Sequence, residues 1–365
     1  MLRRRSDLVA VTAALALVCA GLLGGCTGTA RGETSGSSAT ASARQFLHRY
    51  VSSSGAVVRH DQGGDTVSEG QGYAMLLAYA VNDRSLFTKI WRWTSRHLRQ
   101  PSGLFAYHWQ NGSVADTQPA ADADTQIAWA LDLAGRRWSI TADTTAARRI
   151  AGAIAANEIG YDENGRPTLA AGPWAVGAGQ PVQVEPGYWT FPADAALAVL
   201  TNDNRWRDLA AADAAHLKAL TRNGATLPPD WATIGSGSGP TPSPAPGTGA
   251  SIATGQDGLR ALAWAACLPA THTLDARWWK LVAPTARSGP LTRNIDGSPA
   301  ADGPSPLSLV AAAAAAKEAG HVATMRSLLA RANQTAQQQP TYYGDAWNAI
   351  GHILLSTKLI PGCTP

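Results

Sequence analysis

A succession of alanine-rich segments, each long enough to form a helix, most constrains the fold of this chain. Alanine is the strongest helix former, and these segments are separated by short loops rather than by strands. Residues 84–98 also place Phe87, Ile90, Trp91, Thr94 and Leu98 on one helix face. The remaining segments are 71–81, 124–133 (with Gly135 as its expected end), 194–200, 206–220, 257–266, 305–319 and 345–356. Strand-like alternation is confined to 56–59 and 106–109, so the sequence predicts a mainly α-helical fold.

Composition narrows the classes of function. The chain has 365 residues, of which 15% are charged and 45% hydrophobic, as expected of a globular protein with a sizeable core. The net charge of +4 comes with no basic block beyond residues 3–5, which argues against a nucleic-acid partner. Tryptophan, with 13 residues, outnumbers phenylalanine, with 4. Because the indole N–H needs a partner, this excess favours flat, wet stacking surfaces such as sugar-binding clefts.

The N-terminus has the features of an export signal. Three arginines lead an apolar run and then small residues in residues 1–26, which predicts a secretory signal peptide. Residues 23–26, Leu-Gly-Gly-Cys, resemble a lipobox that would make Cys26 the lipidated first residue of a membrane-anchored lipoprotein facing outside. The alternative is an ordinary cleaved signal and a fully secreted protein. Residues 27–42 are polar and rich in Gly, Ser and Thr, which predicts a flexible tether.

The rest of the chain, residues 43–365, is expected to form one catalytic domain. Residues 235–249 are rich in Pro, Gly and Ser and are interpreted as a surface insertion, with a true domain boundary as the alternative. After export, Cys267 and Cys363 would be the remaining cysteines, and the sequence leaves open whether they pair. The histidines are scattered and no cysteine cluster has metal-ligand spacing, so neither a metal site nor a cofactor is expected.

Three loops place carboxylates at the starts of predicted helices. Glu69 lies in SEGQGY, where two glycines let other groups come close to the backbone, although a helix-dipole role is the plainer interpretation. Asp122 and Asp124 precede an apolar helix that one of them, most naturally Asp124, could cap. Asp257 is the second residue of QDGLRALAW and could be a cap that pairs with Arg260. Three such loops suit a site gathered at one end of a helical array.

Glycosidic hydrolysis needs this kind of carboxyl set. One carboxyl is kept protonated to donate to the leaving oxygen, and another is ionised to attack or to activate water. A neighbouring arginine favours the ionised form of a carboxyl, while burial favours the protonated form. Asp257 beside Arg260 is therefore the expected base, and Glu69 the expected acid.

Four motifs in order resemble those of glycoside hydrolase family 8: VSEGQGYAMLLA, DTQPAADADTQIAWAL, PGYWTFPADAAL and GQDGLRALAW. LFAYHW, LPPDW and residues 342–345 extend the resemblance to roughly residues 43–360. The chain departs from the family where Ala121 replaces a usual Ser or Thr, where Gln126 replaces a frequent acid and where Gln256 replaces a Tyr. The first two departures bear on how Asp122 is positioned.

The resemblance implies an all-α (α/α)6 barrel with an open substrate groove. It makes Glu69 the general acid and Asp257 the general base, and it assigns Asp122 to binding and distorting the sugar ring beside the scissile bond. Tyr188 would help to hold the catalytic water, and Arg260 would support the base. Aromatic candidates for stacking on sugars are Trp93, Trp109, Trp129, Trp189 and Tyr343, of which Trp109 and Trp189 are favoured and Trp129 is the more typical core residue.

The function predicted from these features is endo-acting cleavage of β-1,4-glucan with inversion, by an exported monomer that is anchored to the membrane through Cys26. A chitosanase or a xylanase on the same scaffold is the alternative within the class. A non-catalytic lipoprotein that binds polysaccharide is the alternative from another class. An exported helical scaffold would explain the apolar helices but not the loop carboxylates.

Overall fold

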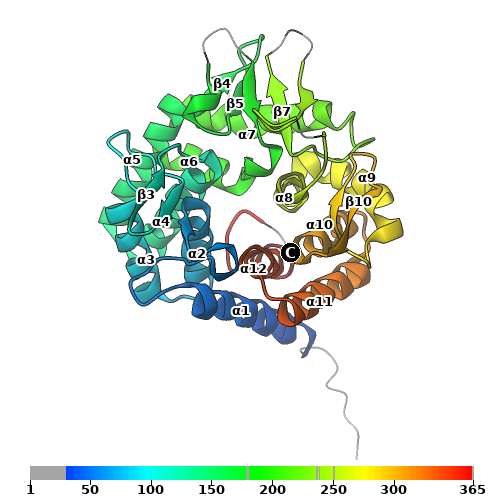
Figure 1. Cartoon of the computed structure of the whole chain (residues 1–365), viewed down its shortest axis with the longest axis horizontal. Helices are drawn as coiled ribbons and strands as arrows, with labels where there is room; N and C mark the ends of the chain where they lie inside the picture. The colour runs from blue at the N-terminus through cyan, green and yellow to red at the C-terminus, as the bar shows by residue number, and fades with distance from the viewer. Residues whose placement is uncertain (1–29, 178–180, 236, 238, 250, 364–365) are drawn as a thin grey trace, which may run out of the picture.

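The computed structural model describes residues 30–363 except 178–180, 236, 238 and 250. The twelve α-helices in this part of the chain alternate between an outer and an inner ring (Figure 1). The outer ring consists of α1 (Ala30–Tyr50), α3 (Arg84–His97), α5 (Thr141–Asn157), α7 (Asn204–Leu220), α9 (His272–Val282) and α11 (Val322–Gln338). The inner ring consists of α2 (Ser68–Ala80), α4 (Ala121–Trp138), α6 (Phe191–Thr201), α8 (Gln256–Ala265), α10 (Pro306–Glu318) and α12 (Tyr342–Ser356). The predicted (α/α)6 barrel is confirmed.

Burial explains the two rings. In α10 every residue from Pro306 to Ala316 is buried, and a helix that is apolar on all sides must be enclosed by its neighbours. An outer helix such as α3 is amphipathic and buries only Phe87, Ile90, Trp93 and Thr94. The ring closes on itself because α12 contacts both α2 and α1.

The predicted tether over residues 27–42 is wrong for its described part. Helix α1 begins at Ala30, and its residues Ala39, Ala43 and Phe46 are fully buried. Their spacing continues one apolar helix face through a stretch whose Ser, Thr and Gly content indicated a tether. The predicted signal peptide and Cys26 lie outside the described residues. Within the described part, no helix has the length and apolar character needed to cross a bilayer.

Helix boundaries differ from the predicted ones where packing decides them. Gly135 does not end α4, which continues to Trp138. A Cβ at Gly135 would lie 2.3 Å from the Thr144 hydroxyl, so this glycine lets α4 and α5 approach closely. Asp124 does not cap α4, because its carboxylate accepts a hydrogen bond from the Phe105 N–H at 2.9 Å. Helices α5, α9 and α11 were not predicted.

Short antiparallel strands lie in the loops between the helices. One sheet joins β1 (Thr66–Val67), β2 (His108–Gln110) and β3 (Ser113–Asp116), and another joins β6 (Val182–Val184), β7 (Trp231–Ile234) and β8 (Thr241–Ser243). Two-stranded sheets pair β4 (Ile159–Tyr161) with β5 (Pro167–Leu169) and β9 (Pro290–Arg293) with β10 (Pro299–Pro304). The Pro/Gly/Ser-rich segment 235–249 contains β8, which pairs with β7.

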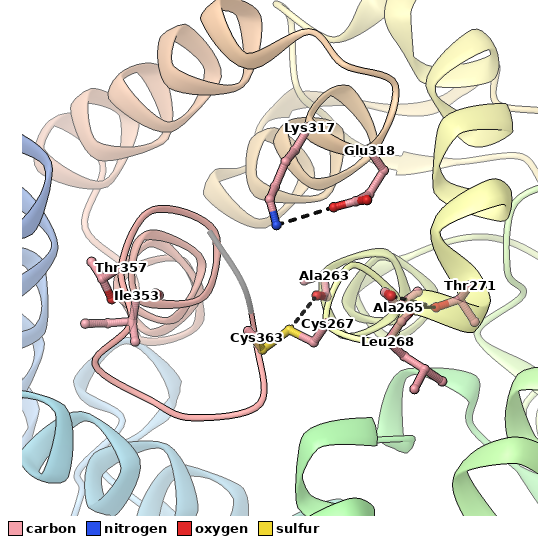
Figure 2. Close-up of a disulfide and its surroundings, with 10 residues drawn as sticks. All are labelled: Ala263, Ala265, Cys267, Leu268, Thr271, Lys317, Glu318, Ile353, Thr357 and Cys363. Carbon is pink, nitrogen blue, oxygen red and sulfur yellow. Dashed lines mark hydrogen bonds and ion pairs between the residues drawn. A yellow bond between two sulfur atoms is a disulfide. The ribbon is translucent and has the colours of Figure 1, made fainter. Parts of the chain in front are cut away.

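A disulfide joins Cys267 to Cys363 with an S–S distance of 2.01 Å, which answers the question that the sequence leaves open. Figure 2 shows the bond between the end of α8 and the tail that follows α12, near the Lys317–Glu318 ion pair. Cys267 follows the last residue of α8, whereas Asp257 lies in its first turn. The disulfide is therefore at the end of α8 opposite to the predicted site.

Candidate active site

A cleft of about 650 Å³ opens over the starts of the inner helices. The ionisable side chains that line it are Glu69, Asp116, Asp122, Glu185, Asp257, Arg260, Tyr107 and Tyr188. Helices α2, α4 and α8 contribute one predicted carboxylate each, from their first turns. A hollow of similar size on the outer wall, between α1 and α3, is lined by none of these residues.

Arg260 joins the three predicted carboxylates. Its Nη1 donates to Glu69 Oε2 at 2.9 Å and to Asp122 Oδ2 at 2.8 Å, and its Nη2 donates to Asp257 Oδ1 at 2.7 Å. The guanidinium is 1% exposed and packs over the Tyr188 ring, 5.0 Å from the ring centroid. Charge-assisted hydrogen bonds of this length are strong when water is excluded, so Arg260 fixes the carboxylates relative to one another.

Glu69 is the second residue of α2 and has the properties of an acid. Burial raises the pKa of its carboxyl to about 7, against the opposing effect of Arg260. The Tyr342 hydroxyl donates to Glu69 Oε1 at 3.2 Å. Because 16% of the Glu69 side chain stays exposed, the carboxyl can reach a ligand in the cleft. A carboxyl of this kind is protonated in a large fraction of molecules near neutral pH.

The two glycines after Glu69 serve packing within the protein. A Cβ at Gly70 would lie 2.7 Å from the Tyr342 hydroxyl, and one at Gly72 would lie 3.3 Å from Gln126 Cβ. The close approach that the sequence suggested is therefore made by Tyr342 and by α4. Gly70 makes room for the hydroxyl that binds Glu69.

Asp122 lies deeper than Glu69. Its side chain is 1% exposed, and its Oδ1 accepts a hydrogen bond from the Ala123 N–H at 2.7 Å. Burial raises the pKa of Asp122, and Arg260 opposes this shift. Two residues further along α4, the fully buried Asp124 is directed elsewhere, toward Phe105 and Glu158.

Asp257 is the most accessible of the three carboxylates, with 38% of its side chain exposed. Its backbone is held from two sides. A Cβ at Gly187 would lie 2.0 Å from the Asp257 carbonyl oxygen, so the loop before α6 packs directly on the start of α8. Asp230 Oδ1 accepts hydrogen bonds from the N–H groups of Gly255 and Gly258, both at 2.7 Å. Asp230 belongs to LPPDW, a motif in which sequence reasoning gave it no role.

Two of the predicted stacking residues are core residues. Trp189 is fully buried, and its Nε1 donates to the Leu169 carbonyl at 3.1 Å. Trp129 is 1% exposed. Neither can offer a face to a sugar, so Trp189 was wrongly favoured.

The other predicted aromatic residues, Trp93, Trp109 and Tyr343, are not among the residues that line the cleft. Trp109 in β2 is half-buried and packs against Trp93 and His97 instead of lining the cleft. Tyr343 lies near Arg260 at the start of α12. Its hydroxyl is buried with no hydrogen-bond partner among the described residues.

Trp174 and Trp231 line the cleft, and sequence reasoning missed both. Their ring centroids are 6.1 Å apart, and Trp174 is 43% exposed. Trp231 is the last residue of LPPDW, and Trp174 follows a Gly-Pro pair, which marks a loop. Loop position next to a motif is the signal that could have found them.

Glu69, a largely buried carboxyl with a raised pKa, and Asp257, a more exposed carboxylate, line the same cleft and bind the same guanidinium. Together with the double ring of helices, this arrangement defines the class of enzymes that hydrolyse glycosidic bonds by acid–base catalysis. A family model described as "Glycosyl hydrolases family 8" matches residues 32–351, and the chain belongs to this family. The resemblance recognised in the four motifs is confirmed.

Several relatives of this chain carry the name endoglucanase. The endoglucanase of Cellulomonas uda is 32% identical over 194 residues, which cover 52% of this chain and 54% of that protein. A probable endoglucanase of Novacetimonas hansenii is 33% identical over 202 residues, covering 52% and 56%. The chain thus spans about half the length of these curated relatives. A solved family 8 endo-β-1,4-glucanase from an Achatina fulica gut metagenomic library matches with a TM-score of 0.71 at 25% identity, covering 85% of this chain and 95% of that one.

Proposed function

We propose that this chain is an endo-acting hydrolase of β-1,4-glucan that inverts the anomeric configuration. The observation that carries the proposal is the bonding of Glu69, Asp122 and Asp257 to the single guanidinium of Arg260 within one cleft. The endoglucanase names of its relatives support the choice of glucan. Binding alone needs no acid–base pair, which disfavours a purely polysaccharide-binding protein.

The reaction requires one proton to enter and one to leave. Protonated Glu69 donates its proton to the leaving glycosidic oxygen as the bond to the anomeric carbon breaks. Asp257 takes a proton from a water molecule, whose oxygen attacks the anomeric carbon from the opposite face. Asp122 binds the ring at the scissile bond, and Tyr188 helps to hold the water. An inverting pair of carboxyls is separated by roughly 6.5–9.5 Å, which leaves room for that water.

The cleft suits internal cutting of a chain. It is open on the surface, and its lining includes Trp174, from the turn Pro173–Ala175, and Trp231, the first residue of β7. Sugar rings stack on aromatic faces, so several consecutive residues of a polymer can be held at once.

Activity on side-by-side substrates tests the proposal. We expect release of reducing ends and a rapid fall in viscosity with carboxymethylcellulose, and no release by the Glu69→Gln variant. Proton NMR of the first product from a cello-oligosaccharide should show the α-anomer. Equal, slow release by the wild type and by Glu69→Gln would reject an enzymatic function, and a β-anomer would reject inversion.

A second substrate class has one observation in its favour. Five carboxyl groups line the cleft, and Arg260 is the only cationic side chain among the described lining residues. Such a lining attracts a polycation, so chitosan is the second candidate, with xylan as a neutral comparison. Faster hydrolysis of chitosan than of β-glucan, with a steep fall in rate at high salt, would favour this alternative.

For location, we propose that the chain is exported and anchored by lipid on Cys26 to the cell membrane, on the side that faces outside. We also propose that it acts as a monomer. The Cys267–Cys363 disulfide supports export, because disulfides persist in oxidising compartments. In cells, Cys26→Ser should move the protein from the membrane to the soluble fraction. Unchanged fractionation of this variant would indicate an ordinary cleaved signal or another anchor. Light scattering at micromolar concentration tests whether the protein is a monomer in solution.

A further inference from the structure

Glu185 is a fourth cleft carboxyl close to Arg260, and the proposed mechanism gives it no role. It directly precedes the loop turn Pro186–Tyr188, and its side chain is 6% exposed. Its Oε2 lies 3.6 Å from Arg260 Nη2, the nitrogen that donates to Asp257 at 2.7 Å. Glu185 is thus on the side of the guanidinium that serves the base.

The surroundings of Glu185 tie it to that side of the cleft. The Tyr188 N–H donates to the Glu185 carbonyl oxygen at 2.9 Å, which closes the turn. The Tyr188 ring lies under Arg260, and Gly187 packs against the backbone of Asp257. The segment from Glu185 to Tyr188 is therefore a single support on which Arg260 and Asp257 rest.

The charge of Glu185 follows from its neighbours. Burial raises the pKa of Glu185 well above its ordinary value, and the negative charges of Asp257 and Asp122 add to this effect. Arg260 and a hydrogen bond with Tyr188 act in the opposite direction but do not outweigh it. The protonated form of the carboxyl is therefore favoured, which weakens its competition with Asp257 for the positive charge of Arg260.

We propose that Glu185 is a positioning residue for the base: it holds the Nη2 edge of Arg260 and the side chain of Tyr188, and thereby fixes the direction of the Asp257 carboxylate. This role rests on the proposed hydrolysis. An uncharged carboxyl fills the space and offers one donor and one acceptor, which an amide of the same shape can supply.

Three substitutions separate shape from charge. Glu185→Ala should lower kcat roughly 10- to 100-fold with little change in KM, because the base is misplaced while the sugar contacts remain. Glu185→Gln should restore kcat to within about threefold of the wild type, because it copies the protonated carboxyl. Glu185→Asp, which is one methylene shorter, should fall between them. Asp194→Asn is the matched control, since Asp194 is a fully buried carboxyl on α6 that does not line the cleft.

A double-mutant cycle tests whether Glu185 acts through the base. In an Asp257→Ala background, with azide supplied as a replacement nucleophile, adding Glu185→Ala should cause no further loss. If Glu185→Ala lowers kcat as much in the Asp257→Ala background as in the wild type, the proposal is overturned. It is also overturned if Glu185→Ala keeps the wild-type kcat, or if Glu185→Gln is as slow as Glu185→Ala. Thermal unfolding of each variant separates misfolding from a catalytic effect. If the wild type hydrolyses none of the glucans, the proposed function fails instead, and that result is distinct from all of these.

Discussion

At the residue scale, the hydrogen bonds of the Arg260 guanidinium determine how the catalytic carboxyls are arranged. Arg260 divides its two terminal nitrogens between the acid side, with Glu69 and Asp122, and the base side, with Asp257. Removing one member of a buried charged network leaves the others unpaired, which costs more than the lost bond alone. Small changes around this arginine should therefore have large effects on rate.

Gly70→Ala tests the space reserved for Tyr342. The added methyl group would lie 2.7 Å from the Tyr342 hydroxyl and would push it away from Glu69. We expect kcat to fall roughly tenfold because the acid loses its orientation. Gly152→Ala on α5, where a Cβ meets nothing within 4 Å, is the control and should keep full activity. Equal activity of both variants would show that the Tyr342 contact is dispensable.

The pH profile tests Glu69 as the acid. Its pKa, raised by burial to about 7, requires kcat/KM to fall as the pH rises through that value, because the ionised carboxyl cannot donate. The Tyr342 hydrogen bond lowers the pKa of Glu69, so Tyr342→Phe should shift the alkaline limb to higher pH. A limb that stays in place in this variant, or a wild type with full activity well above neutral pH, would exclude Glu69 as the proton donor.

At the scale of elements, prediction succeeded where one helix carried its own signal. The inner helices are alanine-rich and apolar all round, so α2, α4, α8 and α10 could be located from the sequence. Two outer helices, α3 and α7, were also predicted, whereas the polar faces of α1, α5, α9 and α11 obscured the side that each of them buries. The Ser/Gly-rich start of α1 and the Thr-rich start of α5 resemble loops until the buried face is known.

The candidate site follows the same rule. Glu69, Asp122 and Asp257 each begin an inner helix, so a helical array brings them to one end and the sequence could predict their meeting. Glu185 and Trp174 come from loops whose paths depend on contacts with other elements. Such positions are not encoded by local periodicity, which is why both were missed.

A buried carboxyl pair joins two elements, since Asp124 on α4 faces Glu158 at the end of α5. Burial raises the pKa of both groups well above the ordinary range, so the folded state binds protons more tightly than the unfolded state. Stability must then fall as the pH rises above the unfolded values. We expect Asp124→Asn to lose less in Tm than the wild type as the pH rises above those unfolded values. Parallel Tm curves for the two proteins would contradict this, and Asp208→Asn, at an exposed site on α7, is the control.

At the scale of the whole molecule, the barrel is stabilised by a covalent link between elements distant in sequence. The disulfide spans 96 residues and fixes the tail after α12 to the end of α8. Chain-entropy arguments assign about 4.7 kcal/mol of unfolding free energy to a loop of this size. Because the bond lies at the other end of α8 from Asp257, it should support the fold without taking part in catalysis.

Replacing both cysteines tests this separation. The Cys267→Ala/Cys363→Ala variant should lose about 4.7 kcal/mol of unfolding free energy and so unfold at a lower denaturant concentration. Its kcat, measured on the folded protein, should be unchanged. The reduced wild type should match it. A variant as stable as the oxidised wild type would remove the stabilising role, and a large loss of kcat at low temperature would show that the two ends of the barrel are coupled.

The packing of α1 against α12 also has a consequence for biogenesis. A ribosome makes α1 before α2 and long before α12, so the apolar face of Ala39, Ala43 and Phe46 can pack against α2 early but lacks its cover from α12 until that helix has been made. Throughout that interval the nascent protein exposes apolar surface on α1, which favours aggregation or binding by chaperones. The ring of helices can close only after α12 has been made, and a chain truncated before α12 should remain bound by quality-control chaperones.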